Sequence, residues 1–550
     1  MNGAEAVLAC LRAEGIKYIF GNPGTTEVPL LDVLSETADI TYLVTLQESV
    51  AMGMADGYAR SGGRIGLVNV HTAAGTSNCL GGMYSAWREK TPLLVTAGCK
   101  DSRMLGRECF SEVPDFAGLP RQFTKWSWQI LRSDRLAEGL LRGIRTALTP
   151  PRGPVFLVLC EDLLCQDVPV QEIISQVPRT SLACAGDPEA LQEAARILAG
   201  ARRPLLIAGT EIAERDALAE AVALADLLAL PVMTEGRDAL MSLNFPHTHP
   251  SFRGDFEPAS PYAREADVVL GIGCRMFTQK SYSPEPDILK GVKIIHLHSD
   301  PHELARLYPE EVSILTDAKR GLQDLQAALQ PLLDKDAQER IRERRQVLQG
   351  EQEDLKRRKE EEIAAAWGKL PLSLPRLVRE LQAAVARDAI IVDESTRSSR
   401  ALLKYYEFAV PGTYYRSAAG VLGWGVPAAL GVKLANPGRQ VVAFVGDGSM
   451  NFSIQSLWTA ASYNIPVVVV ICNNRQYKAV KDASVQYKGN AVRTGKFVAS
   501  DLSAPPIDFC KVAEGYGVWA RQITKPEDIQ PALKEALDLG KPAVLEMLLV

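Results

Sequence analysis

Short apolar segments of strand type recur along the chain, with helical segments between them. The first set comprises YIFGNPG, TYLVTL, IGLVNVH, PLLVTAG and GPVFLVLC, which are rich in Val, Ile and Leu. Ala-rich segments such as ESVAMGMADGYAR and TSNCLGGMYSAW lie between these strands. Continuous apolar strands that alternate with helices are typical of parallel sheets covered on both faces. The sequence therefore predicts an α/β fold of doubly wound parallel sheets.

The same pattern returns twice more. RPLLIAG, LPVMTE, ADVVLGIG and VKIIHLH form a second set of strands, and AIIVDE, QVVAFVGDG, PVVVVICNN and PAVLEML form a third. A length of 550 residues is also that of several ordinary domains. We therefore predict three domains, at residues 1–165, 188–335 and 370–550. Residues 336–369 are so highly charged that we expect a solvated helical linker there.

Composition excludes several classes of protein. The net charge of -5 leaves no basic footprint for nucleic acid, and no apolar run approaches the roughly 20 residues that span a bilayer. The N-terminal segment is amphipathic and acidic, unlike a signal peptide. The ten cysteines form no C-x-x-C pair or zinc-type spacing, so we expect small buried residues in a reducing cytosol. These features predict a cytoplasmic protein that binds neither nucleic acid nor membrane.

The third set of strands carries polar residues at two strand ends. One buried strand runs directly into Gly446, Asp447 and Gly448, and the next ends in Asn473 and Asn474. Carboxyl ends of parallel strands meet at one edge of a sheet, where ligands bind. Glycines let backbone amides approach a phosphate, while carboxylate, amide and carbonyl oxygens suit Mg²⁺. Either piece alone is more often only a turn or a strand end, and the Walker A pattern is absent.

Together, these two pieces resemble the GDG-to-NN diphosphate motif of thiamine diphosphate (ThDP) enzymes. The resemblance covers essentially the whole chain and points to the three-domain superfamily of decarboxylases and acetohydroxyacid synthases. It implies an N-terminal pyrimidine-binding domain, a middle Rossmann-like domain and a C-terminal diphosphate-binding domain, with ThDP and Mg²⁺ as cofactors. By resemblance, Asp447, Asn474 and the carbonyl of Gln476 are the metal ligands, and Gly446, Gly448 and Ser449 bind the cofactor beside them.

Other cofactor contacts follow from the same resemblance. SAAGVLGWGVPAALG is similar to the segment beneath the cofactor, where Gly420 offers backbone contacts to the aminopyrimidine and Leu422 is the apolar wedge that bends ThDP. Without the resemblance, Leu422 would be assigned to core packing. Ser395 and Thr396, after the strand AIIVDE, are expected to hydrogen-bond to the cofactor.

Glu48 follows the strand TYLVTL and opens a helix, as the catalytic Glu of the family does. In the family this carboxyl group bonds the aminopyrimidine and thereby activates the thiazolium ring. A lone Glu here would instead be a helix N-terminal residue favoured by the helix dipole. The family also places this Glu and the diphosphate site on different subunits. The resemblance therefore implies a homodimer or homotetramer with active sites at the subunit interface.

The reaction is indicated by the first domain. FGNPGTTEVPLLDVL and VHTAAGTSNCLGGMYSAW are most similar to benzoylformate decarboxylases, in which a hydroxyl residue and a His face the substrate. Thr25, where those enzymes have Ser, and His71 occupy these positions. The resemblance implies decarboxylation of a 2-keto acid with an aryl or branched side chain through an enamine intermediate, together with carboligase activity.

Several positions near the expected substrate pocket depart from that pattern. Lys280 stands where benzoylformate decarboxylases carry a second His, and it either adds positive charge near a carboxylate or is a solvated residue. Phe110 and Ser111 fall where the family shapes its acyl pocket. Val480 and Ala483 replace bulkier apolar groups, which predicts a roomier pocket.

Two alternatives remain open. RQFTKWSWQI resembles a segment of the acetolactate synthases, which carry FAD in the middle domain, although the glycine turn of GIGCRMF is too weak a flavin signature. The first alternative is that the chain is a synthase-like carboligase. The second is that it is a non-catalytic ThDP-binding subunit, which the presence of both Glu48 and the metal motif disfavours.

Overall fold

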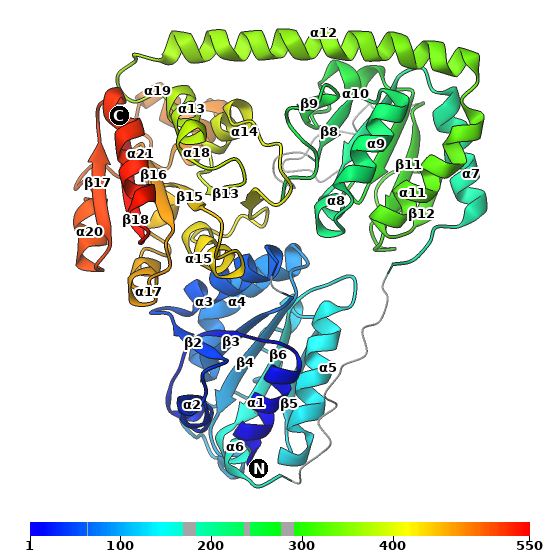
Figure 1. Ribbon diagram of the computed structural model, residues 1–550. Coiled ribbons are helices and arrows are strands. Elements are labelled where there is room, and N and C mark those ends of the chain that lie inside the picture. Colours follow the sequence, from blue (N-terminus) through cyan, green and yellow to red (C-terminus); the bar gives the residue numbers. More distant parts are fainter. Residues whose placement is uncertain (63, 169–182, 236–241, 277–290) are drawn as a thin grey trace. The chain divides into compact units, whose positions relative to one another are not determined.

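The computed structural model contains residues 1–550 and describes all of them except 63, 169–182, 236–241 and 277–290 (Figure 1). Lys280 lies outside the described residues. Three six-stranded parallel sheets with flanking helices make up the fold. The predicted fold class is confirmed. None of the described helices combines the length and the apolar character that crossing a membrane requires.

The first sheet has the strand order β2-β1-β3-β4-β6-β5. Its strands are β1 (Tyr18–Asn22), β2 (Thr41–Val44), β3 (Gly66–His71), β4 (Leu93–Cys99), β5 (Trp126–Ile130) and β6 (Val155–Cys160). Its helices are α1 (Gly3–Ala13), α2 (Val28–Ser35), α3 (Glu48–Arg60), α4 (Thr72–Arg88), α5 (Leu136–Leu148) and α6 (Glu161–Cys165). Buried Val, Ile and Leu from both faces of the inner strands form its core.

The second sheet has the order β12-β11-β10-β7-β8-β9. Its strands are β7 (Pro204–Ala208), β8 (Val232–Thr234), β9 (Phe252–Asp255), β10 (Val268–Ile272), β11 (Lys293–His298) and β12 (Val312–Leu315). Its helices are α7 (Pro188–Gly200), α8 (Thr210–Glu214), α9 (Leu218–Leu228), α10 (Pro261–Glu265), α11 (Ala318–Leu329) and the charged α12 (Lys335–Ala366). Apolar clusters lie on both faces of this sheet.

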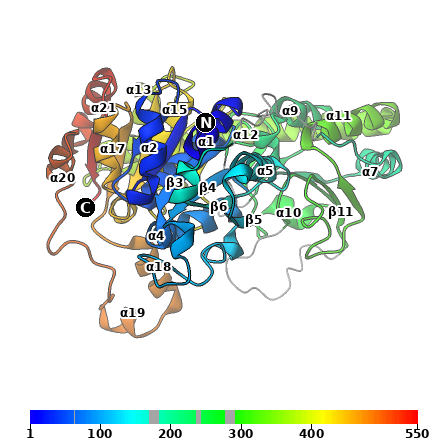
Figure 2. The ribbon, with the colours of Figure 1, turned by 90° about the horizontal axis from the view of Figure 1, so that it is seen from below.

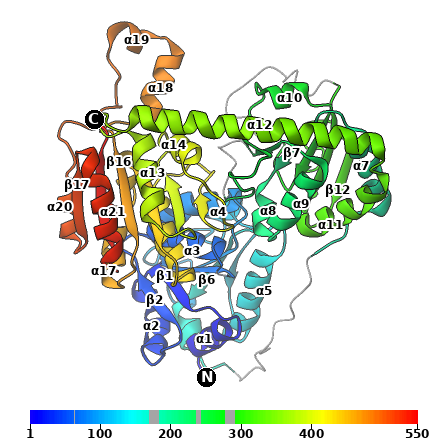
Figure 3. The ribbon, with the colours of Figure 1, turned by 45° about the horizontal axis from the view of Figure 1, so that its top comes forward.

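The third sheet has the order β14-β13-β15-β16-β18-β17. Its strands are β13 (Ile390–Glu394), β14 (Tyr414–Arg416), β15 (Val441–Gly446), β16 (Val468–Asn473), β17 (Trp519–Ile523) and β18 (Ala543–Leu548). The helices are α13 (Leu374–Ala384), α14 (Ser399–Tyr405), α15 (Gly425–Ala435), α16 (Asp447–Met450), α17 (Ser456–Ser462), α18 (Lys478–Tyr487), α19 (Asn490–Thr494), α20 (Phe509–Gly515) and α21 (Ile529–Asp538). The helices α18 and α19 project away from this sheet (Figures 2 and 3).

The chain forms two compact units. One unit contains residues 1–180, 367–402 and 419–550, and the other contains residues 181–366 and 403–418. The first sheet and the strands β13, β15, β16, β17 and β18 of the third therefore belong to one unit, whereas β14 falls in the other. The domain boundaries at residues 165, 188, 335 and 370 stay predictions.

The strands that sequence patterns missed all lie at sheet edges. They are β5, β9, β12, β14 and β17. Edge strands contact a neighbour on one side only, so they lack the continuous apolar run of an inner strand. β9, for example, is half-buried along its whole length, and β12 alternates buried and exposed residues.

Six of the ten cysteines depart from the expectation of isolated buried thiols. Cys99 and Cys160 stand directly opposite each other on β4 and β6 and form a disulfide, with their Cα atoms 4.4 Å apart. Their separation of 61 residues gave no sign of this pairing. Cys10, Cys79, Cys274 and Cys472 are buried free thiols, as expected. Cys165 and Cys184 are exposed and Cys109 and Cys510 are half-buried, so for these four the prediction of burial is wrong.

The helices α3 and α15 pack closely inside the first unit because small residues line both. A Cβ atom on Gly57 would lie 2.2 Å from the Ala428 carbonyl oxygen, and one on Gly431 would lie 1.9 Å from the Met54 carbonyl oxygen. Side-chain bonds reinforce this contact, since Trp424 Nε1 donates to Asp56 at 3.0 Å. Backbone contact at these two points leaves no room for any side chain.

We predict that Gly431→Ala lowers the free energy of unfolding by about 2 kcal/mol because the added methyl group overpacks this contact. Helix propensity alone predicts the opposite sign, a gain of about 1 kcal/mol. Gly350→Ala in α12 is the matched control, since nothing lies within 4 Å of its Cβ position. Chemical denaturation of both variants tests the prediction, and a Gly431→Ala protein as stable as wild type would contradict it.

Candidate active site

The polar residues predicted at the third sheet do meet at one edge. β15 and β16 pair in parallel with Gly446 opposite Cys472, so Asp447, directly after β15, is level with Asn473, the last residue of β16. Asp447 is only 3% exposed. Burial raises the pKa of its carboxyl group, while the backbone N–H groups of Gly448, Asn474 and Arg475 act in the opposite direction. Asp447 therefore lies beside the turn that follows β16.

The two adjacent Asn residues have different surroundings. Asn473 is buried; its Nδ2 donates to Glu546 at 2.5 Å and its Oδ1 accepts from Arg475 N at 2.9 Å. Asn474 is half-buried, and its Oδ1 accepts one bond from Gln476 N at 3.1 Å. Asn473 thus belongs to the core, whereas Asn474 stands at the sheet edge with a lone pair to spare.

This edge fits Mg²⁺ by the chemistry of its oxygens. The Gln476 carbonyl accepts from Lys478 N at 2.9 Å and keeps a second lone pair. With the Asp447 carboxylate and Asn474 Oδ1 it offers the mixed oxygen set that Mg²⁺ prefers. Across the described residues, no group of three His, Cys, Asp or Glu side chains forms a metal site. An ion here therefore depends on amide and carbonyl oxygens besides one carboxylate.

The loop before α15 is held by a buried carboxylate. Glu394 accepts from the backbone N–H groups of Gly423 at 2.8 Å, Trp424 at 3.2 Å and Gly425 at 2.7 Å. Gly423 adopts φ 89°, a left-handed conformation that favours glycine. The loop presents Leu422 with 36% of its surface exposed. Since Leu422 is not in the core, the core-packing interpretation of this residue is wrong.

Other predicted cofactor residues lie around the same sheet edge. Ser395, directly after β13, is buried, and its hydroxyl donates to Asp393 at 2.7 Å. Thr396 adopts φ 49° and Gly420 adopts φ 79°. Ser449 is buried in α16. Contacts of these residues with a cofactor stay predictions.

Glu48 occupies the first position of α3 and is 7% exposed. Asn22 Nδ2 donates to its Oε1 at 3.1 Å, and Asn78 Nδ2 donates to its Oε2 at 2.9 Å. Both donors are neutral, so the buried carboxylate is solvated without being cancelled by a cation. Neither Asn was predicted. They reach Glu48 from the end of β1 and from α4, a proximity that no sequence spacing reveals.

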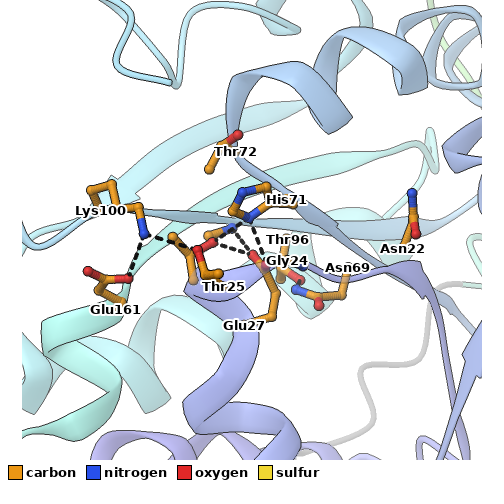
Figure 4. Close-up of polar contacts among 12 residues, drawn as sticks. Asn22, Gly24, Thr25, Glu27, Asn69, His71, Thr72, Thr96, Lys100 and Glu161 are labelled. Atoms are coloured by element: carbon orange, nitrogen blue, oxygen red, sulfur yellow. Dashed lines mark hydrogen bonds and ion pairs between the residues drawn. The ribbon is translucent and has the colours of Figure 1, made fainter. Parts of the chain in front are cut away.

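His71, the last residue of β3, is oriented by a buried carboxylate (Figure 4). Its Nδ1 lies 3.0 Å from Glu27 Oε2 and 2.9 Å from Thr26 Oγ1. The Thr26 hydroxyl donates to Glu27 Oε1 at 2.8 Å, so its oxygen accepts from His71. Both partners of Nδ1 are therefore acceptors, which places the ring proton on Nδ1 and leaves Nε2 as the other functional nitrogen.

Glu27 is the functional residue that sequence patterns missed most clearly. Besides His71 and Thr26, its oxygens accept from Gly24 N at 2.8 Å and from Gly98 N at 3.0 Å. These four partners come from β3, β4 and the turn after β1. In the sequence, Glu27 is indicated only by its position in GNPGTTE, part of the segment that resembles the benzoylformate decarboxylases.

Thr25 and Phe110 lie near His71. Thr25 is exposed and shares its turn with Thr26 and Glu27. The ring of Phe110 is 6.5 Å from the imidazole, centroid to centroid, and Phe110 is 70% exposed. Ser111 follows with φ 62°. The structure thus gathers Thr25, His71 and Phe110 at the carboxyl edge of the first sheet.

Comparison with known proteins decides the family. Residues 1–119 match the family described as Thiamine pyrophosphate enzyme, N-terminal TPP binding domain; residues 191–325 match its central domain and residues 395–547 its C-terminal TPP binding domain. Benzoylformate decarboxylase from Pseudomonas aeruginosa is 34% identical over 541 residues, which cover 98% of this chain and 97% of that one. The chain belongs to the thiamine pyrophosphate enzymes.

Two further relatives bear on the reaction. A probable acetolactate synthase large subunit of Methanococcus aeolicus is 30% identical over 99% of this chain and 92% of its own. Among solved structures, the thiamine diphosphate-dependent 4-hydroxybenzoylformate decarboxylase of Rhodococcus jostii RHA1 has a TM-score of 0.85 and 29% identity, covering 100% of this chain and 99% of that one. These relatives confirm the predicted family and enzyme class, and they support the decarboxylase interpretation over the synthase one.

For this thiamine pyrophosphate enzyme, the structure describes no contact between His71 and two other residues predicted for the pocket, Val480 and Ala483. Val480 and Ala483 are exposed on α18. The segment RQFTKWSWQI, which suggested a synthase, contains the edge strand β5.

We predict that Asn474→Ala and Asn473→Ala separate function from stability. Asn474→Ala should weaken Mg²⁺-dependent ThDP binding at least tenfold, because it removes an oxygen that is predicted to bind Mg²⁺, while leaving the melting temperature nearly unchanged. Asn473→Ala should instead cost about 1–3 kcal/mol of stability, since Glu546 loses a buried partner. Calorimetric titration and thermal melts of both variants check this. A loss of stability in Asn474→Ala together with a loss of ThDP binding in Asn473→Ala would contradict the prediction.

A pH-dependent prediction concerns Glu394. Burial raises its pKa from 4.5 to about 7. Between these pH values the folded chain keeps a proton that the unfolded chain releases, so this group's contribution to stability falls as pH rises through the window and is constant above it. Glu394→Gln cannot titrate. The stability difference between wild type and variant should therefore change by about 3 kcal/mol between pH 4.5 and 7.

Glu235→Gln is the matched control for that experiment. Burial raises the pKa of Glu235 to about 7 as well, but this residue lies in the other unit. In both variants, the free energy of unfolding measured by denaturation should vary less with pH between about 4.5 and 7 than it does in wild type. Only Glu394→Gln should weaken ThDP binding. A pH-independent difference for Glu394→Gln would refute the predicted titration.

Proposed function

We propose that this chain is a ThDP- and Mg²⁺-dependent decarboxylase of a 2-keto acid with an aryl or branched side chain, with carboligation as a second activity. The observation that carries the proposal is the Glu27–His71 pair, which leaves Nε2 available beside Thr25 and Phe110. Full-length similarity to a benzoylformate decarboxylase supports the same substrate class.

When bound, ThDP supplies the electron sink that lets a 2-keto acid lose carbon dioxide. We assign Glu48 to the aminopyrimidine end, because it is a buried carboxylate whose two donors among the described side chains are neutral amides. Asn22 and Asn78 hold its two oxygens in place. Their rigidity favours a fixed position for the carboxylate relative to the cofactor.

At the other side of the site, His71 Nε2 is the atom that we assign to proton transfer with the substrate. Glu27 fixes the imidazole tautomer and stabilises the ring when it is protonated. Thr25 then donates its hydroxyl proton to the substrate carboxylate, and Phe110 and Ser111 border the acyl group. Lys280, Val480 and Ala483 stay predictions for the far side of the pocket.

The third sheet would hold the diphosphate. Asp447, Asn474 and the Gln476 carbonyl are proposed as the Mg²⁺ ligands. The further cofactor contacts are Ser395, Thr396, Gly420, Leu422, Gly446, Gly448 and Ser449. The pyrimidine-binding and diphosphate-binding assignments of residues 1–165 and 370–550 follow from this division.

We further propose a homodimer or homotetramer with active sites at the subunit interface. Within the part of the chain that the structure describes, no hydrogen bond joins Glu48 to residues 446–476. The apolar side chains of Leu422, Phe452 and Val480 are exposed, which a second subunit would cover. A cytoplasmic location remains part of the proposal.

The synthase-like alternative rests on one observation, the 30% identity with an acetolactate synthase. Acetolactate as the main product, or flavin absorbance in the purified protein, would favour it over the decarboxylase.

The test is turnover by the purified enzyme with ThDP and Mg²⁺. Benzoylformate, branched 2-keto acids and pyruvate form the panel, and carbon dioxide and carbon–carbon products are both followed. Glu48→Gln should lose at least a hundredfold in kcat with ThDP still bound, because the amide does not accept the proton. Glu138→Gln, an exposed acid in the first turn of α5, is the matched control.

Two results would contradict the proposal. One is the absence of turnover of every 2-keto acid by protein with bound ThDP. The other is full activity of Glu48→Gln, which would remove Glu48 from its assigned role.

A further inference from the structure

Lys100 lies inside the cluster around Thr25, although no sequence pattern pointed to it (Figure 4). Its Nζ is 3.0 Å from Thr25 Oγ1 and 3.4 Å from Glu161 Oε2. The side chain is 21% exposed. Lys100 follows β4, Thr25 follows β1 and Glu161 follows β6, so three strand ends of the first sheet meet at this ammonium group.

In the hydrogen bond between Lys100 and Thr25, Lys100 is necessarily the donor. An ammonium group carries three donors and no acceptor, so Thr25 Oγ1 must accept. The hydroxyl proton of Thr25 is then left for another acceptor. Among the described residues no other hydrogen bond to this hydroxyl is found, and Thr25 is exposed. Lys100 therefore leaves the proton of the exposed Thr25 hydroxyl available to the acceptor of a bound ligand.

Charge balance argues for positioning rather than for capture of a separate anion. Glu161 forms an ion pair with Lys100, and both side chains are largely shielded from solvent. The pair has no net charge, so it presents no free cation. It does polarise the Thr25 hydroxyl, because a nearby cation makes an accepting hydroxyl a stronger donor.

The turn at residues 25–27 is thus fixed from two sides. Glu27 and Thr26 are bonded to His71, and Thr25 is bonded to Lys100. A hydroxyl donor and an imidazole Nε2 are thereby both oriented from one short turn. Such an arrangement suits a substrate that offers an acceptor carboxylate next to a carbon that exchanges a proton.

We propose that Lys100 is a positioning residue that holds the Thr25 hydroxyl ready to donate to the carboxylate of the 2-keto acid. The proposal rests on the proposed function and deepens it by naming how the carboxylate is recognised. Lys100 itself does not touch the substrate.

The test is a double-mutant cycle of Lys100→Met, Thr25→Val and the double variant. Lys100→Met should raise KM for the 2-keto acid roughly tenfold with a smaller change in kcat, since a bond to the substrate carboxylate is weakened. The double variant should be no worse than Thr25→Val alone. Lys100→Arg, which still donates to Thr25, should restore most of the affinity.

Lys125→Met is the matched control. Lys125 Nζ donates to the carbonyls of Thr146 and Thr149 at 2.6 Å each, outside the cluster. Its loss should lower the melting temperature without a change in KM. Additive losses in the cycle, or an unchanged KM in Lys100→Met, would overturn the inference.

The same double-mutant cycle can be measured without turnover, from the Kd of mandelate for wild type and the three variants. Mandelate is a 2-hydroxy acid that cannot be decarboxylated. If wild type turns over no 2-keto acid but the mandelate cycle is non-additive, the proposed function fails and the inference on Lys100 stands. If wild type turns over substrate but the cycle is additive, the inference fails alone. No binding of mandelate to wild type, together with no turnover, would overturn both.

Discussion

Parallel strand pairing in register is the constraint on which both candidate sites depend. In the third sheet, Gly446 stands opposite Cys472, so the residues that follow β15 and β16 emerge together. In the first sheet, His71 stands opposite Gly98 and Cys99 opposite Cys160. A shift of one residue in either register would turn the functional side chains to the other face. The register is in turn set by inner strands that are buried on both sides.

Three buried carboxylates show how one fold serves different chemical purposes. Glu394 is bonded by three backbone N–H groups and stabilises a loop. Glu27 is bonded by His71, a hydroxyl and two backbone amides, which suits orientation of an imidazole. Among the described residues, the Glu48 carboxylate accepts from two side-chain amides, those of Asn22 and Asn78. Partner chemistry, not burial, distinguishes these carboxylates, because all three are buried while their hydrogen-bond donors differ.

In the three described sheets, sequence patterns predicted every inner strand and missed five of the six edge strands. Val468–Asn473 is a fully buried strand with a continuous apolar pattern, whereas Phe252–Asp255 is a half-buried edge strand without one. At the sites, the GDG turn and the two Asn residues were visible because they directly follow buried strands. The separate surroundings of Asn473 and Asn474 were not, because they depend on Glu546, which lies on the neighbouring strand β18. The same holds for Glu27, Asn78 and Lys100, whose partners are 44, 30 and 75 residues away.

The sequence by itself determined the parallel α/β fold and the ThDP family, since both depend on local patterns: strand hydrophobicity and short motifs at strand ends. Tertiary structure alone decided which side chains support those motifs. It brought Glu27 to His71, two Asn amides to Glu48 and Lys100 to Thr25. The physical reason is that a parallel sheet joins residues that are distant along the chain, and hydrogen-bond partners across strand ends leave no periodic or spacing signal in the sequence.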